Sequence, residues 1–299
     1  RNWSEHKRIE LDDDDSKSII KHGGLLLGEG GTGKSTTIER IKKLLPANSF
    51  IIGAFTHIAS ENIGGDTLHR ICGIDVKTKQ IAYKLFKSYK KQGVTHLIID
   101  EISMMPSWIW NIVGHLIHEH HFIIIGAGDW GQLPPVHEEH IDFENSWIVK
   151  YVFNYNVYEL IEVKRTSDKD LLRDTSAIRN DGAIDYTTYG TCEHPTALCY
   201  TNDAVNAINK KWNEHYAKEH SKTKTLNGFD NTKYILYNGL KMLSYKTHGQ
   251  RLFKNSQQYV VQSWTDDSIT LKQTQGKHIG RIIDIDIKYS ISFKAGYAM

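Results

Sequence analysis

The chain has 299 residues, of which 39% are hydrophobic and 24% are charged, ordinary values for a globular protein with room for two domains. The formal net charge of +2 is too small to indicate a polyanionic partner, so any nucleic-acid surface must come from local clustering of basic residues. No apolar run approaches the ~18 residues that a membrane span needs. The three cysteines, Cys72, Cys192 and Cys199, lack paired spacing, which argues against a disulfide framework or a zinc site and favours a reducing compartment inside the cell.

The first part of the chain has the pattern of an α/β domain. Residues 1–22 are polar, and the simplest expectation for their acidic run, Asp12–Asp15, is a solvated loop. After it, apolar segments that predict buried strands alternate with helical patterns. The predicted strands are 24–27, 50–55, 95–99 and 122–126. This alternation predicts a parallel sheet covered by helices, in a first domain over residues 1–157.

Two segments of this domain are rich in basic or histidine side chains. Residues 77–91 predict an amphipathic helix with six lysines, which face water or, as an alternative, a phosphate backbone. The histidines near the last predicted strand lack the H-E-x-x-H spacing of a helical metal site, so we expect solvated side chains rather than a metal centre. They are His115, His118, His120, His121, His137 and His140.

A second α/β unit is predicted over residues 158–299. Its expected strands are 158–163 and 196–200, and its expected helices are 169–180 and 203–219. From about residue 233 to residue 290, short β-branched and aromatic runs are separated by turn residues, and this texture predicts a small all-β, barrel-like insertion.

The segment from Gly28 to Ser35 fits the pattern G-x-x-x-x-G-K-[ST], in which backbone N–H groups and a helix N-terminus hold a polyphosphate. Lys34 can reach the β and γ phosphates, and Ser35 can ligate Mg²⁺. We therefore expect a nucleoside triphosphate to be bound here. The expected contacts come from Gly28, Glu29, Gly30, Gly31, Thr32, Gly33, Lys34, Ser35 and Thr36.

Gly28, Gly30 and Gly33 also fit G-x-G-x-x-G, the pattern of dinucleotide-binding folds. Those folds place an acidic residue at the end of the second strand to bind the ribose, but no acidic residue follows strand 50–55 before Glu61. A dinucleotide site also leaves the Lys-Ser pair of the loop unexplained, so the triphosphate interpretation is favoured.

Two later strands also end in polar side chains. Asp100 and Glu101 follow a buried strand, where Asp100 can hold Mg²⁺ and Glu101 can orient and deprotonate an attacking water. The strand 122–126 leads to a turn that contains Gln132, whose amide can contact both the γ-phosphate and that water. Such a group senses whether the phosphate is present.

Together, these strand ends resemble superfamily 1 helicases, and in particular the superfamily 1B branch of the petite-integration-frequency DNA helicases and the RecD-like enzymes. The matching stretches are Asp100–Met104 (motif II), Gly128–Val136 (motif III), Phe55–Ser60 and Asn62–His69 (motif Ia and the segment after it), and Glu162–Thr166 followed by Ile178–Gly182 (the motif with the catalytic arginine). The likeness extends from about Gly24 to the last residue.

The resemblance implies an ATP-dependent 5′-to-3′ DNA motor of the P-loop NTPase class, with two RecA-like domains and a small β-rich (SH3-like) insertion in the second. Its cofactors would be ATP and Mg²⁺, the metal being held by Ser35 and Asp100. Arg165, from the second lobe, would stabilise charge on the γ-phosphate. The implied catalytic residues are Lys34, Glu101, Gln132 and Arg165.

The implied partner is single-stranded DNA or a forked duplex, bound by a monomer. The implied DNA contacts are Thr56, His57, Thr67, His69, Thr201 and Asn202. Hydroxyl and imidazole groups can bond phosphate oxygens without reading bases. Ordinary helix capping by Thr56 and Thr201, and a plain turn at 64–67, are the alternatives.

The chain departs from the family pattern in three places. No Gln precedes the P-loop to read adenine, the segment between His69 and His96 leaves room for only a small wedge, and the sequence ends at what resembles the lead-in to motif V. The first residue is Arg rather than Met, and a fragment and a helicase that departs from the family pattern are both open interpretations. A non-motor nucleic-acid-stimulated ATPase, a viral-type superfamily 1 RNA helicase and a small-molecule kinase are the alternative functions.

Overall fold

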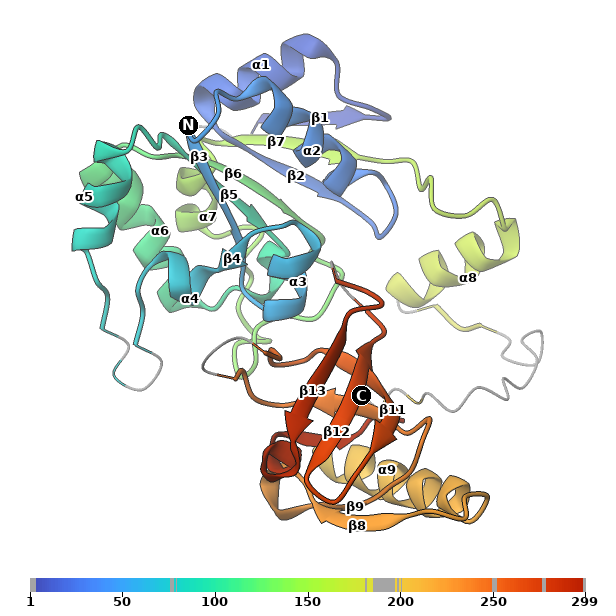
Figure 1. Cartoon of the computed structure of the whole chain (residues 1–299). Helices are drawn as coiled ribbons and strands as arrows, with labels where there is room; N and C mark the ends of the chain where they lie inside the picture. Colours follow the sequence, from blue (N-terminus) through green and yellow to red (C-terminus); the bar gives the residue numbers. More distant parts are fainter. Residues whose placement is uncertain are drawn as a thin grey trace. The chain divides into compact units, whose positions relative to one another are not determined.

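The computed structural model describes residues 4–75, 78, 80–180, 182–184, 197, 199, 201–248, 252–275 and 278–297. The chain divides into two compact units, Arg1–Tyr186 and Thr187–Met299 (Figure 1). The expected boundary at residue 157 therefore lies too early. The reason is that strand β7 (Asn156–Leu160), expected to open the second unit, pairs with two strands of the first.

The described part of the first unit contains a seven-stranded sheet in the order β1-β7-β2-β6-β5-β3-β4. All its strand pairs are parallel. Besides β7, the strands are β1 (Ser4–Arg8), β2 (Gly24–Gly28), β3 (Phe50–Ala54), β4 (Asp66–Thr67), β5 (His96–Asp100) and β6 (Ile123–Gly128). The four strands expected from apolar runs are confirmed as β2, β3, β5 and β6, while β1 and β4 were not predicted.

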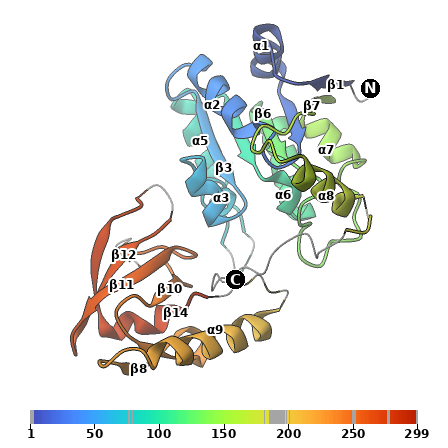
Figure 2. The same ribbon diagram turned by 90° about the vertical axis from the view of Figure 1, so that its right-hand side faces the viewer.

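Helices cover both faces of this sheet (Figures 1 and 2). The described helices of this unit are α1 (Asp13–His22), α2 (Lys34–Leu44), α3 (His57–Asn62), α4 (Leu68–Ile71), α5 (Lys84–Lys91), α6 (Ser107–His120), α7 (Trp147–Val152) and α8 (Lys169–Arg179), of which α8 lies away from the sheet in Figure 1. Successive residues of a strand point to opposite faces, so Leu25 packs in the core that contains α6 and α7, and Leu26 packs in the core that contains α1 and α2. Strands buried on both faces explain the continuous apolar runs in the sequence.

The solvated loop expected at Asp12–Asp15 is wrong, because this acidic run begins helix α1. Asp12 is the N-cap, and its side chain accepts from the N–H of Asp15 (2.7 Å) in a capping box. Asp15 is 8% exposed and pairs with Arg8 (2.8 Å). Carboxylates are favourable at a helix N-terminus, so a run of aspartates can open a helix as well as a loop.

The lysine-rich helix expected over 77–91 is confirmed only from Lys84 onward, as α5. Ile81 instead forms an isolated antiparallel bridge with Ile74, and so the chain is extended there. Two of the histidines expected to be solvated contact aromatic rings: His115 lies 5.1 Å from Tyr83, and His120 lies 5.8 Å from Phe86.

The second unit is helix α9 (Asn202–Ala217) with antiparallel sheets (Figure 2). Asn213 of α9 exchanges two hydrogen bonds with the backbone of Ile235, which fixes the helix against β9. One sheet pairs β8 (Lys224–Asn227) with β9 (Lys233–Leu236), and the other has the order β13-β12-β11-β10-β14. The strands of the second sheet are β10 (Lys241–Ser244), β11 (Gln258–Trp264), β12 (Ser268–Gln273), β13 (Ile282–Asp286) and β14 (Phe293–Ala295).

The β-rich texture predicted from residue 233 is thus an antiparallel sheet with its own aromatic core, which includes Tyr234, Tyr259 and Phe293. Helix 203–219 is confirmed as α9. Most of the expected strand 196–200 lies outside the described residues. Across the residues that are described, the second unit contains no parallel strand pair, so the second RecA-like sheet is not seen. No helix in the described parts of either unit combines the length and apolarity that crossing a bilayer requires.

Candidate nucleotide-binding site

The P-loop joins β2 to α2, the strand–loop–helix setting that its sequence predicts. Gly33 is the N-cap of α2 and has a left-handed backbone (φ 96°), which glycine adopts without strain. The Lys34 Nζ donates to the carbonyl oxygens of Gly28 (2.6 Å) and Glu29 (2.9 Å), so the ammonium lies across the loop. Burial lowers the pKa of Lys34, and the nearby carboxylates oppose that shift. A triphosphate would offer this ammonium stronger, charged acceptors.

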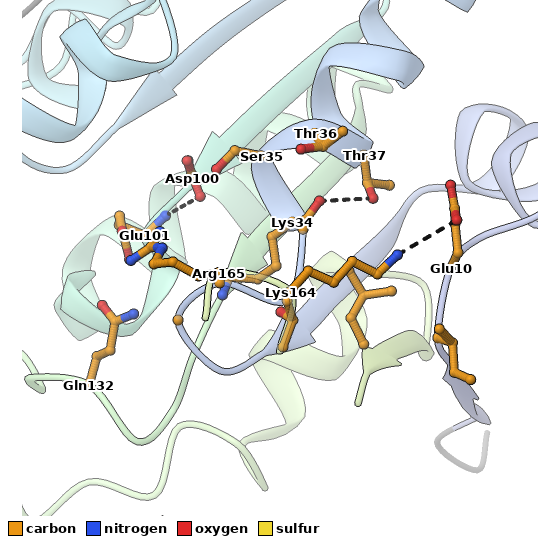
Figure 3. Close-up of a pocket in the computed structure, with 16 residues that line it drawn as sticks. Glu10, Lys34, Ser35, Thr36, Thr37, Asp100, Glu101, Gln132, Lys164 and Arg165 are labelled. Carbon is orange, nitrogen blue, oxygen red and sulfur yellow. Dashed lines mark hydrogen bonds and ion pairs between the residues drawn. The ribbon is translucent and has the colours of Figure 1, made fainter. Parts of the chain in front are cut away.

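A cavity of about 450 Å³ opens beside the loop (Figure 3). The predicted ATP contacts Gly28 and Glu29 do not line it, but all the predicted catalytic and metal-binding side chains do. They are Lys34, Ser35, Asp100, Glu101, Gln132 and Arg165, together with Gly30–Thr36 of the loop. Figure 3 shows Asp100, Glu101 and Gln132 toward one end of the cavity and Glu10 at the other. Residues distant in the sequence therefore surround one space, because parallel strands end at the same edge of the sheet.

Asp100 and Glu101 form the acidic end of this cavity. Asp100 closes β5 and is 7% exposed, and burial raises the pKa of its carboxyl. Glu101 has a left-handed backbone (φ 52°), and its N–H donates to the Asp100 carboxylate (2.9 Å). Burial, and then the charge of Asp100, raise the pKa of Glu101. A carboxyl whose pKa is raised toward neutrality is a better proton acceptor than an ordinary one.

The residues present fit a magnesium ion. Ser35 and Asp100 line the same cavity, and Figure 3 draws their side chains next to each other. A hydroxyl and one buried carboxylate are hard oxygen donors, and Mg²⁺ uses few protein ligands because it keeps water and phosphate oxygens. A cation there would also offset the cost of burying the Asp100 charge.

Gln132 lies in the turn after β6, where its N–H donates to the carbonyl of Asp129 (3.0 Å). Its side chain is exposed and borders the cavity. Asp129 itself is 3% exposed and accepts from the N–H of Gly131 (3.0 Å). The buried aspartate therefore shapes the turn that presents the glutamine.

Arg165 lies on the first unit and not on a second lobe, which corrects the expected origin of this side chain. The segment after β7 docks directly on the P-loop, where the N–H of Lys164 donates to the carbonyl of Gly31 (2.8 Å). Lys164 also pairs with Glu10 (3.6 Å). A Cβ at Gly31 would lie only 2.5 Å from the Cβ of Arg165, so the glycine permits this close approach.

The residues predicted to contact DNA lie mainly at helix starts. Thr56 caps α3 by accepting from Ala59 (3.2 Å), and Thr67 caps α4 by accepting from Arg70 (3.4 Å). In the second unit, Thr201 caps α9, and Asn202 is that helix's first residue. Each threonine hydroxyl therefore accepts one capping hydrogen bond. Contact of these residues with DNA remains a prediction.

His57 and His69 lie on α3 and α4, which follow β3 and β4 at the carboxyl edge of the sheet. The ring of His69 lies 5.3 Å from Phe55 and 5.6 Å from Trp108. Burial, and then the charge of His57, lower the pKa of His69. An imidazole that is neutral at physiological pH can still bond a phosphate oxygen through its N–H.

Sequence reasoning missed part of the cavity wall. Ile9, Glu10, Thr37, Leu160 and Lys164 also line it. The first two follow strand β1, which was not predicted. Lys164 precedes Arg165 in the stretch Glu162–Thr166, which already resembled the motif with the catalytic arginine. That resemblance could have indicated that Lys164 also lines the cavity.

Comparison with known proteins agrees with this geometry. Residues 17–138 match the family model described as an AAA domain. The chain is 31% identical over 218 residues to the ATP-dependent DNA helicase PIF1 of Xenopus laevis, a match to 62% of this chain and 33% of that protein. It is 30% identical over 179 residues to the ATP-dependent DNA helicase RRM3 of Saccharomyces cerevisiae, a match to 51% of this chain and 24% of that protein. The matches thus span a third or less of these curated relatives.

Two solved structures share the fold. The Pif1 helicase from Candida albicans superposes with a TM-score of 0.68 at 18% identity, covering 98% of this chain and 86% of that one. The Pif1 helicase from Bacteroides, solved with ADP-AlF3 and ssDNA, superposes with a TM-score of 0.66 at 18% identity, covering 97% of this chain and 82% of that one. At this identity the likeness establishes the fold.

Proposed function

We propose that this chain is a Pif1-like helicase of superfamily 1B, which hydrolyses ATP to move 5′ to 3′ along single-stranded DNA and to unwind duplexes. The observation that carries the proposal is the single cavity lined by Lys34, Asp100, Glu101, Gln132 and Arg165. The relatives named above are ATP-dependent DNA helicases, and one structural neighbour was solved with ssDNA and ADP-AlF3.

In this proposal the P-loop N–H groups and Lys34 hold the phosphates, and Glu101 orients and deprotonates the attacking water. Arg165 and Gln132 contact the γ-phosphate, where the arginine stabilises charge that builds up in the transition state. Ser35 and Asp100 would hold Mg²⁺, which would neutralise charge on the phosphate oxygens when it is bound.

The partner in this proposal is single-stranded DNA or a fork, bound by a monomer through the DNA backbone. Thr56, His57, Thr67 and His69 of the first unit, with Thr201 and Asn202 of the second, would contact phosphate oxygens. These groups are polar and mostly uncharged, so they position the strand without selecting its sequence.

The first test measures ATP hydrolysis with and without oligonucleotides. We expect deoxyoligonucleotides to stimulate the 299-residue chain, less so as salt rises, because phosphate contacts are screened. Lys34→Ala and Glu101→Gln should abolish turnover and retain DNA binding, whereas Lys43→Ala, an exposed lysine on the same helix as Lys34, should behave as the parent. Wild-type rates in either site variant would refute the proposal.

The second test measures strand separation on a forked duplex with a 5′ single-stranded arm. Unwinding that needs ATP and that arm supports the motor. Stimulated hydrolysis without strand separation would assign the chain to the class of non-motor ATPases, and stronger stimulation by ribo-oligonucleotides would assign it to RNA.

A further inference from the structure

Arg179, at the end of helix α8, joins two parts of the nucleotide site that are far apart in the chain. Its guanidinium donates to the carboxylate of Asp129, in the turn after β6. The same guanidinium lies 3.6 Å from the carboxylate of Glu29, in the P-loop. A planar guanidinium can serve two acceptors at once with fixed geometry, which a lysine ammonium cannot do in the same way.

The contact with Asp129 lies in a protected place. Asp129 is 3% exposed and also holds the N–H of Gly131, while its backbone carbonyl holds the N–H of Gln132. A nearly buried carboxylate that loses its cation is costly, and its neighbours rearrange to relieve the charge. The arginine therefore stabilises the one conformation of the turn that places Gln132 at the cavity.

The guanidinium also packs on the turn itself. A Cβ built at Gly131 would lie 2.1 Å from the Nη1 of Arg179, so any side chain at position 131 would push the arginine away from Asp129. Arg179 does not reach the triphosphate cavity directly. It lines a neighbouring cavity of about 850 Å³ with Glu29, Asp129 and Gly131.

From this arrangement we propose that Arg179 is a positioning residue for ATP hydrolysis, which holds the Gln132 turn and the P-loop in register and ties both to α8. Helix α8 is the last described helix before the segment that leads to the second unit. This inference rests on the proposed function, because it concerns the same hydrolysis reaction.

The test is steady-state ATPase kinetics of Arg179→Ala, Arg179→Lys and Gly131→Ala. Displacing a reacting group by about an ångström costs on the order of 100-fold in rate, so we expect kcat to fall by about 10- to 100-fold in Arg179→Ala and Gly131→Ala. KM for ATP and the affinity for a fluorescent ADP analogue should stay within about threefold, because the groups that hold the phosphates remain. Arg179→Lys should recover part of the rate.

The matched control is Arg173→Ala on the same helix. Arg173 pairs with Asp170 and Asp174, like Arg179 with its two carboxylates, but its side chain is 65% exposed. We expect this variant to keep the parental kcat. A double-mutant cycle of Arg179→Ala and Asp129→Asn adds a second readout. If Arg179 acts through Asp129, kcat of the double variant should be no lower than kcat of the slower single variant.

A parental kcat in Arg179→Ala would overturn the inference, and so would an ADP affinity that falls as much as the rate. If Arg179→Ala does not fold, Gly131→Ala, which keeps both charges, decides the question on the same criteria. A chain in which Lys34→Ala also leaves hydrolysis unchanged would instead refute the proposed function. Loss of activity in Lys34→Ala with normal activity in Arg179→Ala would refute this inference alone.

Discussion

Alanine substitutions at three glycines of the P-loop can distinguish the effect of backbone strain from the effect of a clash with Arg165. Gly30 has open space for a Cβ and no positive φ, Gly33 has open space but a φ of +96°, and Gly31 has a φ of +92° and a Cβ position 2.5 Å from Arg165. Substitution by alanine should therefore introduce no strain and no clash at Gly30, backbone strain alone at Gly33, and both strain and a clash at Gly31.

The magnitudes follow from these three environments. A left-handed backbone costs an alanine about 1–2 kcal/mol, so Gly33→Ala and Gly31→Ala should share that loss of unfolding free energy. Overpacking adds about 1–3 kcal/mol in Gly31→Ala. Since each kcal/mol moves the melting temperature of a domain of this size by about 2–4 °C, Gly31→Ala should melt about 2–12 °C below Gly33→Ala. Gly30→Ala should melt with the parent.

The ATPase assay then tests the function of the contact. Moving the segment that carries Arg165 away from the P-loop should slow hydrolysis by about 10- to 1,000-fold in Gly31→Ala, the upper figure being the typical worth of such an arginine. Gly93→Ala is the reference for kcat, because it adds the same methyl group to a left-handed glycine that does not line the cavity. If the two variants hydrolyse ATP at equal rates, the docking of Arg165 on the loop has no part in the reaction.

Three further predictions concern the fold and its ionisation. Asp12→Ala should lower the unfolding free energy by about 1 kcal/mol in denaturant titration, because the capping box of α1 is lost. Phe153→Ala should cost about 3–5 kcal/mol, since this fully buried ring packs on Trp110, and Phe153→Leu should cost much less. Burial raises the folded-state pKa of Glu101, so its charge opposes folding increasingly as pH rises from the ordinary carboxylate pKa through the raised one. Glu101→Gln should therefore melt above the parent at pH 7, and the difference should vanish in acid; a constant difference across pH would contradict the assigned shift.

The strands and motifs of the nucleotide site could be predicted because each has a local cause. Residues buried on both faces of a parallel sheet leave uninterrupted apolar runs, and polar residues that follow those runs lie at one edge. This reasoning located Lys34, Asp100, Glu101 and Gln132 around a single cavity.

The features that were not predicted depend on contacts between distant parts of the chain, which a local sequence pattern does not show. The aspartates of residues 12–15 suit a loop or a helix start, and the sequence pattern does not show that Asp15 pairs with Arg8 at the end of β1. The segment Asn156–Leu160 has the sequence pattern of a strand, but the pattern does not show which strands it pairs with. Its position between β1 and β2 is set by the tertiary structure. Arg179 was one residue in a matching stretch, and only the structure shows that it meets Asp129.

The order of strands in the sheet has a consequence for how this chain is made. β2 carries the P-loop, but its two neighbours, β6 and β7, come much later in translation, and β1 has β7 as its partner. Until Leu160 has left the ribosome, the nascent P-loop strand has an open edge that invites pairing with other chains. A truncated protein that stops before Leu160 would keep every P-loop residue and still aggregate. A piece in which the P-loop strand is paired on both sides therefore has to extend through β7.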